Sequence, residues 1–236
     1  VLWALYALKP AAPLKNALSA GLLAGLAFFA KQTAGMVFLP LAVFLLIKHR
    51  RSGLISSGTF VLLAIGGTIL LNHVHRGYYN YYVIDLPRRH VMVRGLIPGF
   101  WVKDIIARFP LALALILAGF VALVRRRSIK DPLFLALAGV GMLGGSWFSR
   151  VHYGGYENVL IPAYAAIALF SGLALAAIRR HLREARSGWE SVICLSVALQ
   201  FAMLVYNPIR QVPTRGDYAA GRAFVRNMAG LAADIY

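Results

Sequence analysis

Lys31 lies between two apolar runs, and a lysine in that position is suited to binding an anion. The surrounding residues 19–46 read SAGLLAGLAFFAKQTAGMVFLPLAVFLL. A single helix over residues 17–47 would be about 46 Å long, beyond a hydrocarbon core of about 30 Å. The pattern therefore favours two helices that turn at Lys31-Gln32-Thr33, slightly below the membrane surface. A lysine at that depth costs on the order of 3 kcal/mol unless it is paired, or it snorkels to the headgroups.

Two polar connections carry the other candidate residues. In SRVHYGGYEN, residues 149–158, charged side chains adjoin a Gly-Gly pair that permits tight turns. In YYVIDLPRRH, residues 81–90, arginines suited to phosphate oxygens follow tyrosines suited to a membrane interface or a sugar face. Ordinary interfacial loops explain both patterns too, with Glu157 offsetting Arg150. The candidate phosphate-binding residues are Lys31, Arg88, Arg89 and Arg150, and the candidate pocket residues are His90, His152, Tyr153, Gly154, Gly155, Glu157 and Asn158.

Apolar segments separated by polar connections predict an all-α, polytopic transmembrane helical bundle of about seven spans, with interfacial helices in the outer loops. The chain of 236 residues is 60% hydrophobic and 14% charged, whereas soluble domains average about 25% charged. Residues 1–206 would form the transmembrane domain, and residues 207–236 an extracytoplasmic tail or the start of a C-terminal domain. We expect the glycine-rich fifth span to make close helix contacts. The predicted spans are residues 17–30, 34–47, 54–72, 110–124, 133–148, 159–178 and 189–206.

The distribution of basic residues predicts the sidedness of an integral protein of a plasma or inner membrane. Short connections of one parity hold 13 of the 25 Lys and Arg residues. The other 12 lie on the opposite face, whose longest connection and tail are long segments on which charge matters less, so loop length assigns the short connections to the cytoplasm. The Lys31 turn, residues 73–104, residues 149–158 and the tail then share the extracytoplasmic face. Orientation and anionic lipid explain the net charge of +17, so we expect no nucleic-acid partner. The 13 residues are Lys9, Lys15, Lys48, Arg50, Arg51, Arg125, Arg126, Arg127, Lys130, Arg179, Arg180, Arg183 and Arg186.

Several kinds of site are excluded by residue type. Cys194 is the single cysteine, which excludes an intramolecular disulfide and a cysteine metal cluster. It lies within an apolar run, so we expect it to be a buried packing residue. His73 and His75 are two residues apart and would not share a helix face, so we expect no metal site from this pair. No nucleotide-phosphate loop, nucleophile elbow or zinc signature is present. No cofactor follows from these residues, although a divalent cation is compatible with them.

The segments GLLAGLAFFAKQTA, YYVIDLPRRH and GGYENVLIPAYAAIAL resemble the middle and C-terminal part of the C-type (GT-C) integral-membrane glycosyltransferases. This superfamily includes protein O-mannosyltransferases and lipid A aminoarabinose transferases. The resemblance implies a cell-envelope glycosyltransferase that moves a sugar from a polyprenyl-phosphate carrier to a lipid, glycan or protein acceptor, with its active face extracytoplasmic. It matches Lys31 to the carrier phosphate, and Asn158 with Gly154 and Gly155 to the shaping of the pocket.

The resemblance also implies that a catalytic group lies elsewhere. The acidic residues that activate the acceptor in this family lie in a first outer loop, N-terminal to residue 1, so the catalytic base stays unassigned. The opening VLWALYAL resembles the end of an apolar segment, and we expect the chain to be part of a longer protein. The alternatives are a transporter or flippase fragment for an anionic lipid-linked substrate, and a structural membrane subunit. A transporter predicts charged residues that face each other deep within the helices.

Overall fold

The computed structural model describes residues 14–125, 132–184, 188–207, 209 and 212–233. Each named element within these residues is a helix, accompanied by an isolated antiparallel bridge between Met92 and His152. The all-α prediction is therefore confirmed. The chain divides into two compact units, residues 1–200 and residues 201–236. The opening VLWALYAL and five residues used to predict sidedness lie outside the described residues, namely Lys9, Arg126, Arg127, Lys130 and Arg186.

The first apolar stretch forms two helices, α2 (Leu14–Ala30) and α3 (Ala34–Lys48), separated by the turn 31–33. The predicted break at Lys31-Gln32-Thr33 is confirmed, and a single helix over residues 17–47 does not form. The N–H of Lys31 still donates to the carbonyl of Ala27, while the N–H of Ala34 already donates to the carbonyl of Lys31, at 2.9 Å in both cases. The chain thus changes direction within one tight turn.

The remaining long helices follow the other apolar runs, each beginning and ending near the predicted span. They are α4 (Arg50–Val74), α8 (Pro110–Arg125), α9 (Pro132–Arg150), α10 (Ile161–Glu184) and α11 (Glu190–Met203).

The lengths of these helices do not establish a bundle of seven spans. Among the described residues, three helical segments are long and apolar enough to cross a membrane: Arg50–Val74, Pro132–Arg150 and Glu157–Leu182. A fourth arises if Leu96–Ile106 and Pro110–Leu123, which are bent by 81°, form one broken span. The helices α2, α3 and α11 are apolar but shorter, since a full crossing takes about 20 residues.

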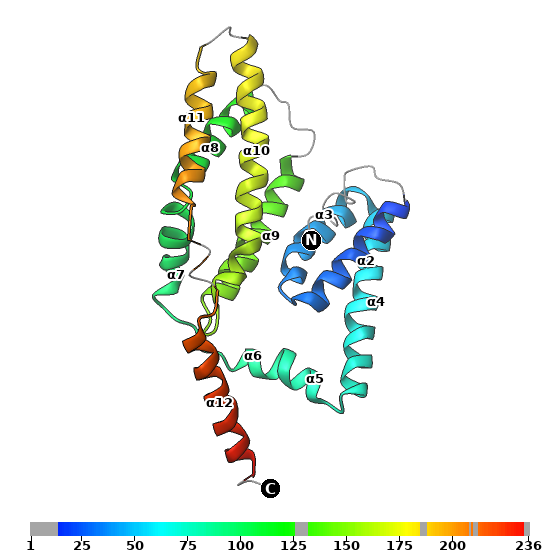
Figure 1. The fold of residues 1–236 in the computed structure, drawn as a ribbon. Helices are drawn as coiled ribbons and strands as arrows, with labels where there is room; N and C mark the ends of the chain where they lie inside the picture. The colour runs from blue at the N-terminus through cyan, green and yellow to red at the C-terminus, as the bar shows by residue number, and fades with distance from the viewer. Residues whose placement is uncertain (1–13, 126–131, 185–187, 208, 210–211, 234–236) are drawn as a thin grey trace. The chain divides into compact units, whose positions relative to one another are not determined.

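Close helix contacts organise the first unit (Figure 1). Helix α2 packs against α4, α3 against α9, and α10 against both α8 and α9. A Cβ on Gly141 of α9 would lie 2.9 Å from the Cα of Val37 on α3, so only glycine allows this approach. The prediction of close contacts by the glycine-rich fifth span is confirmed.

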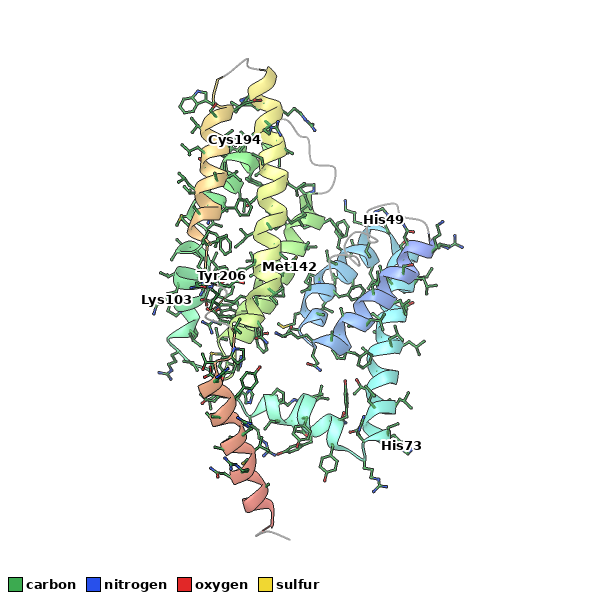
Figure 2. The ribbon with its side chains drawn as sticks, in the orientation of Figure 1. His49, His73, Lys103, Met142, Cys194 and Tyr206 are labelled. Carbon is green, nitrogen blue, oxygen red and sulfur yellow. The ribbon has the colours of Figure 1, made fainter. Side chains whose placement is uncertain are left out.

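Cys194 is exposed on α11 (Figure 2), so its predicted burial is wrong. The physical reason is that α11 exposes most of its apolar side chains, among them Leu195 and Leu199. An apolar run therefore does not by itself indicate burial inside the protein.

The long polar connection contains short helical pieces, as predicted for an interfacial loop. They are α5 (Tyr78–Asn80), η1 (Tyr81–Asp85), α6 (Leu86–Arg88), α7 (Leu96–Gly99) and η2 (Phe100–Ile106), and a further short helix, η3 (Glu157–Leu160), leads into α10. The second unit contains α12 (Arg215–Ala233).

Two buried polar side chains complete the first turns of helices. The Gln200 side-chain oxygen accepts hydrogen bonds from the N–H groups of Leu111 (3.1 Å) and Ala112 (3.0 Å) at the start of α8. Its amide nitrogen donates to the carbonyl of Arg108 at 2.8 Å. The Ser146 hydroxyl accepts from the N–H of Ala163 at 3.0 Å, in the first turn of α10. These N–H groups have no partner within their own helices.

Candidate functional site

Three polar connections of the first unit meet around one cavity of about 670 Å³. Residues 28–33 contribute from the end of α2 and the turn after it, and residues 83–90 from the long connection. Residues 148–159 contribute from the end of α9 and the connection after it, and α4 adds Thr68. The sequence predicted that these connections share one face, and the cavity brings them together. The lining residues are Phe28, Gln32, Thr33, Thr68, Val83, Ile84, Pro87, Arg88, His90, Phe148, Ser149, His152, Tyr153, Gly154, Gly155 and Val159.

Backbone hydrogen bonds join two of these connections directly. The N–H of Val93 donates to the carbonyl of Val151 at 2.7 Å, and the N–H of Tyr153 donates to the carbonyl of Val91 at 3.0 Å. Met92 and His152 stand opposite each other in the resulting antiparallel bridge. This bridge holds the segment carrying Arg88 and His90 beside the segment carrying His152 and Tyr153.

Arg150 links the same region to η2 by two hydrogen bonds. Its Nε donates to the Asp104 carboxylate at 2.8 Å, and a second guanidinium nitrogen donates to the Gly155 carbonyl at 2.6 Å. The side chains of Arg150 and Asp104 are only 19% and 6% exposed. The expectation that Glu157 offsets Arg150 is wrong, because Glu157 pairs with Arg108 at 2.7 Å instead. Arg150 lies at the end of α9 and is directed towards η2, which supplies the buried carboxylate.

The Gly-Gly pair is required by the turn that it forms. Gly154 has a φ angle of +82°, a left-handed conformation that glycine adopts without strain. A Cβ on Gly155 would overlap the carbonyl oxygen of Ser149. Both positions therefore need glycine, and the turn directs the backbone of this connection into the cavity lining.

Lys31 is half-buried at the turn and immediately precedes the lining residues Gln32 and Thr33. Burial lowers the pKa of its ammonium group from the ordinary value of 10.5. None of the ion pairs between described residues joins Lys31 or Arg88 to a carboxylate. Both cations are thus available to an anion in this part of the protein.

The candidate residues separate into two groups by position. Arg88, His90, His152, Tyr153, Gly154 and Gly155 line the cavity, whereas Lys31, Arg89, Arg150, Glu157 and Asn158 do not. Arg89 and Asn158 are exposed beside it. Thr68 and Ser149 line the cavity but were not predicted from the sequence. The pairing of Asp104 with Arg150 next to the cavity was not predicted either. Thr68 lies in an apolar helix, and no pattern in the sequence marks it.

The lining suits a ligand with an anionic part and an apolar part. Arg88 and Thr33 carry donors for oxygen atoms, while Phe28 and Phe148 supply apolar walls. The Ser149 hydroxyl already donates to the carbonyl of Gly145 at 2.9 Å. His152 Nδ1 lies 2.7 Å from the carbonyl of Phe148, which places a proton on Nδ1 because a carbonyl oxygen only accepts.

The lining, which falls entirely within the described residues, contains no aspartate or glutamate. In the described part of the chain, no group of three or more His, Cys, Asp or Glu residues could hold a metal ion.

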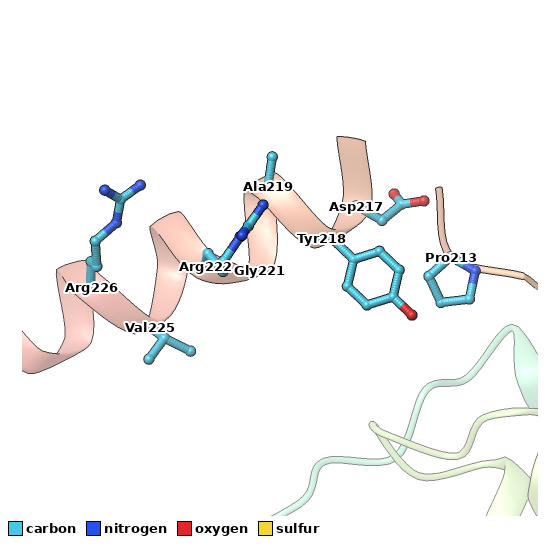
Figure 3. Close-up of a pocket in the computed structure, with 8 residues that line it drawn as sticks. All are labelled: Pro213, Asp217, Tyr218, Ala219, Gly221, Arg222, Val225 and Arg226. Carbon is cyan, nitrogen blue, oxygen red and sulfur yellow. The ribbon is translucent and has the colours of Figure 1, made fainter. Parts of the chain in front are cut away.

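A second hollow, of about 900 Å³, lies along α12 in the other unit (Figure 3). Pro213 and residues of the first turns of α12, Asp217 to Arg226, line it. All of them come from one segment, and its side chains do not converge on a common point. We therefore place the candidate site at the cavity of the first unit.

Comparison of the chain with protein-family models, with curated proteins and with solved structures gives no significant match in any of the three. The residues and their geometry therefore carry the functional argument alone.

Proposed function

We propose that the chain is part of a membrane glycosyltransferase that moves a sugar from a polyprenyl-phosphate carrier to an extracytoplasmic acceptor. The observation that carries this proposal is the convergence of three polar connections on one cavity, with Arg88 in its wall and Lys31 beside it. A polyprenyl-phosphate sugar combines a charged phosphate, a sugar and an apolar tail. The cavity offers cationic, hydrogen-bonding and aromatic groups for these three parts.

In this mechanism the basic residues stabilise the leaving group. As the bond between sugar and phosphate breaks, negative charge develops on the phosphate oxygens. The Arg88 guanidinium and the Lys31 ammonium offset that charge. Because Arg150 is bound to Asp104, we assign it to holding the glycine turn in place. The described residues that line the cavity include no carboxylate, so the base that deprotonates the acceptor is not assigned to any of them.

The proposal includes seven membrane crossings. The four candidate spans and the shorter helices α2, α3 and α11 together make seven apolar elements. Helix α2 exposes Leu14, Leu18, Leu22 and Leu26 at four-residue spacing, a stripe that suits lipid contact. Short helices cross when the bilayer thins locally, at a cost of a fraction of a kcal/mol per Å. The cavity would then open on the extracytoplasmic side, as the basic connections indicate.

The test is Lys31→Ala in the full-length protein, reconstituted in vesicles with a radiolabelled polyprenyl-phosphate sugar. Sugar transfer to membrane acceptors should fall by about 10- to 100-fold, because a charge-assisted interaction contributes roughly 1.5–3 kcal/mol. The matched control is Lys103→Ala, which removes an exposed lysine outside the cavity lining. Membrane insertion should be normal in both variants. Unchanged transfer in Lys31→Ala would contradict the assignment of Lys31.

The same assay has a pH arm. Since the folded pKa of Lys31 is lowered, Lys31 loses its charge at a lower pH than an ordinary lysine does. Transfer should therefore decline on the alkaline side as the pH rises through that folded pKa. Lys31→Arg should shift the decline to higher pH, because arginine stays protonated. Translocation of the intact carrier with no sugar released would point to a flippase instead of an enzyme.

A further inference from the structure

Helix α12 has two chemically different faces. Figure 3 shows Ala219, Arg222 and Arg226 directed to one side of the helix, and Tyr218 and Val225 to the other. At 100° per residue, Arg215 falls on the same side as Arg222 and Arg226. Phe224 and Met228 fall within the apolar arc that also contains Val225. The helix is therefore amphipathic, with a basic face.

The apolar face of α12 is open. Tyr218, Phe224, Val225 and Met228 are between 51% and 65% exposed. Exposed aromatic and aliphatic side chains in a single stripe indicate a surface that is covered in use.

The charge of α12 favours an anionic partner. Residues 215–230 contain three arginines, Arg215, Arg222 and Arg226, and one carboxylate, Asp217. That carboxylate accepts hydrogen bonds from both the N–H and the hydroxyl of Thr214 at 2.7 Å. None of the ion pairs between described residues joins it to these arginines, so three positive charges stand against one negative charge.

The covalent connection keeps α12 within reach of a bilayer. Helix α11 ends at Met203 and α12 begins at Arg215, so residues 204–214, eleven in all, connect them. Eleven residues span at most about 40 Å. With α11 as one of the proposed membrane crossings, Arg215 at the start of α12 stays within that distance of the end of α11.

We propose that α12 is an interfacial helix that docks on a bilayer surface containing anionic phospholipid. Tyr218, Phe224, Val225 and Met228 enter the boundary between headgroups and acyl chains, and Arg215, Arg222 and Arg226 bind lipid phosphates. A bilayer fits better than a protein partner, because a basic, amphipathic helix of low net hydrophobicity is typical of helices that lie in the interface.

The experiment places a spin label on each face of α12 in the full chain. In a Cys194→Ser background, which removes the single cysteine, Met228→Cys labels the apolar face. Ala219→Cys labels the opposite face, half a turn away around the helix axis. The protein is reconstituted in vesicles of phosphatidylcholine alone or with one third phosphatidylglycerol. Collision rates of each label with oxygen and with a water-soluble nickel complex report whether it lies in lipid or water.

In vesicles with phosphatidylglycerol, the label at position 228 should collide mainly with oxygen and the label at 219 mainly with nickel. Arg222→Gln combined with Arg226→Gln should lower the ratio of docked to undocked helix by about 25-fold, since each arginine near an anionic surface contributes roughly fivefold. Raising the salt to 1 M should have a similar effect. The matched control, Arg179→Gln with Arg180→Gln on α10, should leave the contrast between the labels unchanged.

Equal access of the nickel complex to both labels in anionic vesicles would overturn the proposal, because the helix would then lie in water. Protection at position 228 that persists in phosphatidylcholine alone and in the arginine variants would overturn it in favour of a protein partner. Dipolar broadening between labels at 228 on two molecules would identify that partner as a second copy of the chain.

Discussion

The cavity of the first unit and helix α12 both present arginines without carboxylate partners among the described residues, yet their surroundings differ. Arg88 shares its cavity with donors and aromatic rings from several segments, whereas Arg222 and Arg226 lie along one face of one helix. Convergent groups select a single ligand of defined shape. Parallel groups on a helix face match a surface that carries many equivalent anions. The arrangement of the arginines, and not their number, therefore separates a binding site from a docking surface.

The largest effect should come from removing the ion pair between Arg150 and Asp104 next to the cavity. Arg150→Ala leaves the nearly buried Asp104 carboxylate unpaired, which should lower the free energy of unfolding by about 3–5 kcal/mol. The measurement is reversible unfolding of the protein in detergent micelles. The matched control, Arg108→Ala, removes the exposed pair with Glu157, whose side chains are 40% and 70% exposed, and should cost at most about 1 kcal/mol.

Equal losses of unfolding free energy in Arg150→Ala and Arg108→Ala would show that the pair beside the cavity contributes no more to stability than the exposed pair. The double variant Asp104→Leu with Arg150→Met should recover much of the lost stability, because it removes both buried charges together.

A smaller effect should separate two adjacent arginines. Arg88→Ala should weaken the binding of polyprenyl phosphate by about 10- to 100-fold, because it removes a charge-assisted contact inside the cavity. Both arginines are exposed, but Arg89 does not line the cavity. Arg89→Ala should therefore change binding less than about threefold. Native mass spectrometry of the full chain in detergent measures both affinities. Equal losses would mean that the region acts as a charged surface, as α12 does.

The smallest effect concerns the start of α12. The hydrogen bonds from Thr214 lower the pKa of Asp217 from its ordinary value of 3.8. This carboxylate therefore stabilises the first turn at pH values above the unfolded pKa, and that support is lost as the pH falls through the lowered, folded pKa. A spin label at position 219 should become more mobile in that acidic range. Asp217→Asn should remove the pH dependence, and a persistent mobility change in that variant would assign it to another group.

The helices and the grouping of polar connections could be predicted from the sequence, while most partners could not. Apolar runs and the lysine at residue 31 predicted the helices and the first turn. The parity of the connections predicted that the Lys31 turn and both polar loops share one face. In contrast, Asp104 and Arg150 are 46 residues apart, and no local pattern links them. The exposure of Cys194 was missed because an apolar run does not distinguish contact with lipid from contact with protein.

The amide of Gln200 has a consequence for how the protein is made. It satisfies backbone groups at residues 108, 111 and 112 from 88 to 92 positions further along the chain. Until the ribosome has produced residue 200, the N–H groups of Leu111 and Ala112 lack this partner. The first turn of α8 therefore reaches its final hydrogen bonding only after α11 has been made. A nascent chain released before residue 200 should expose this turn to proteolysis, whereas the complete chain protects it.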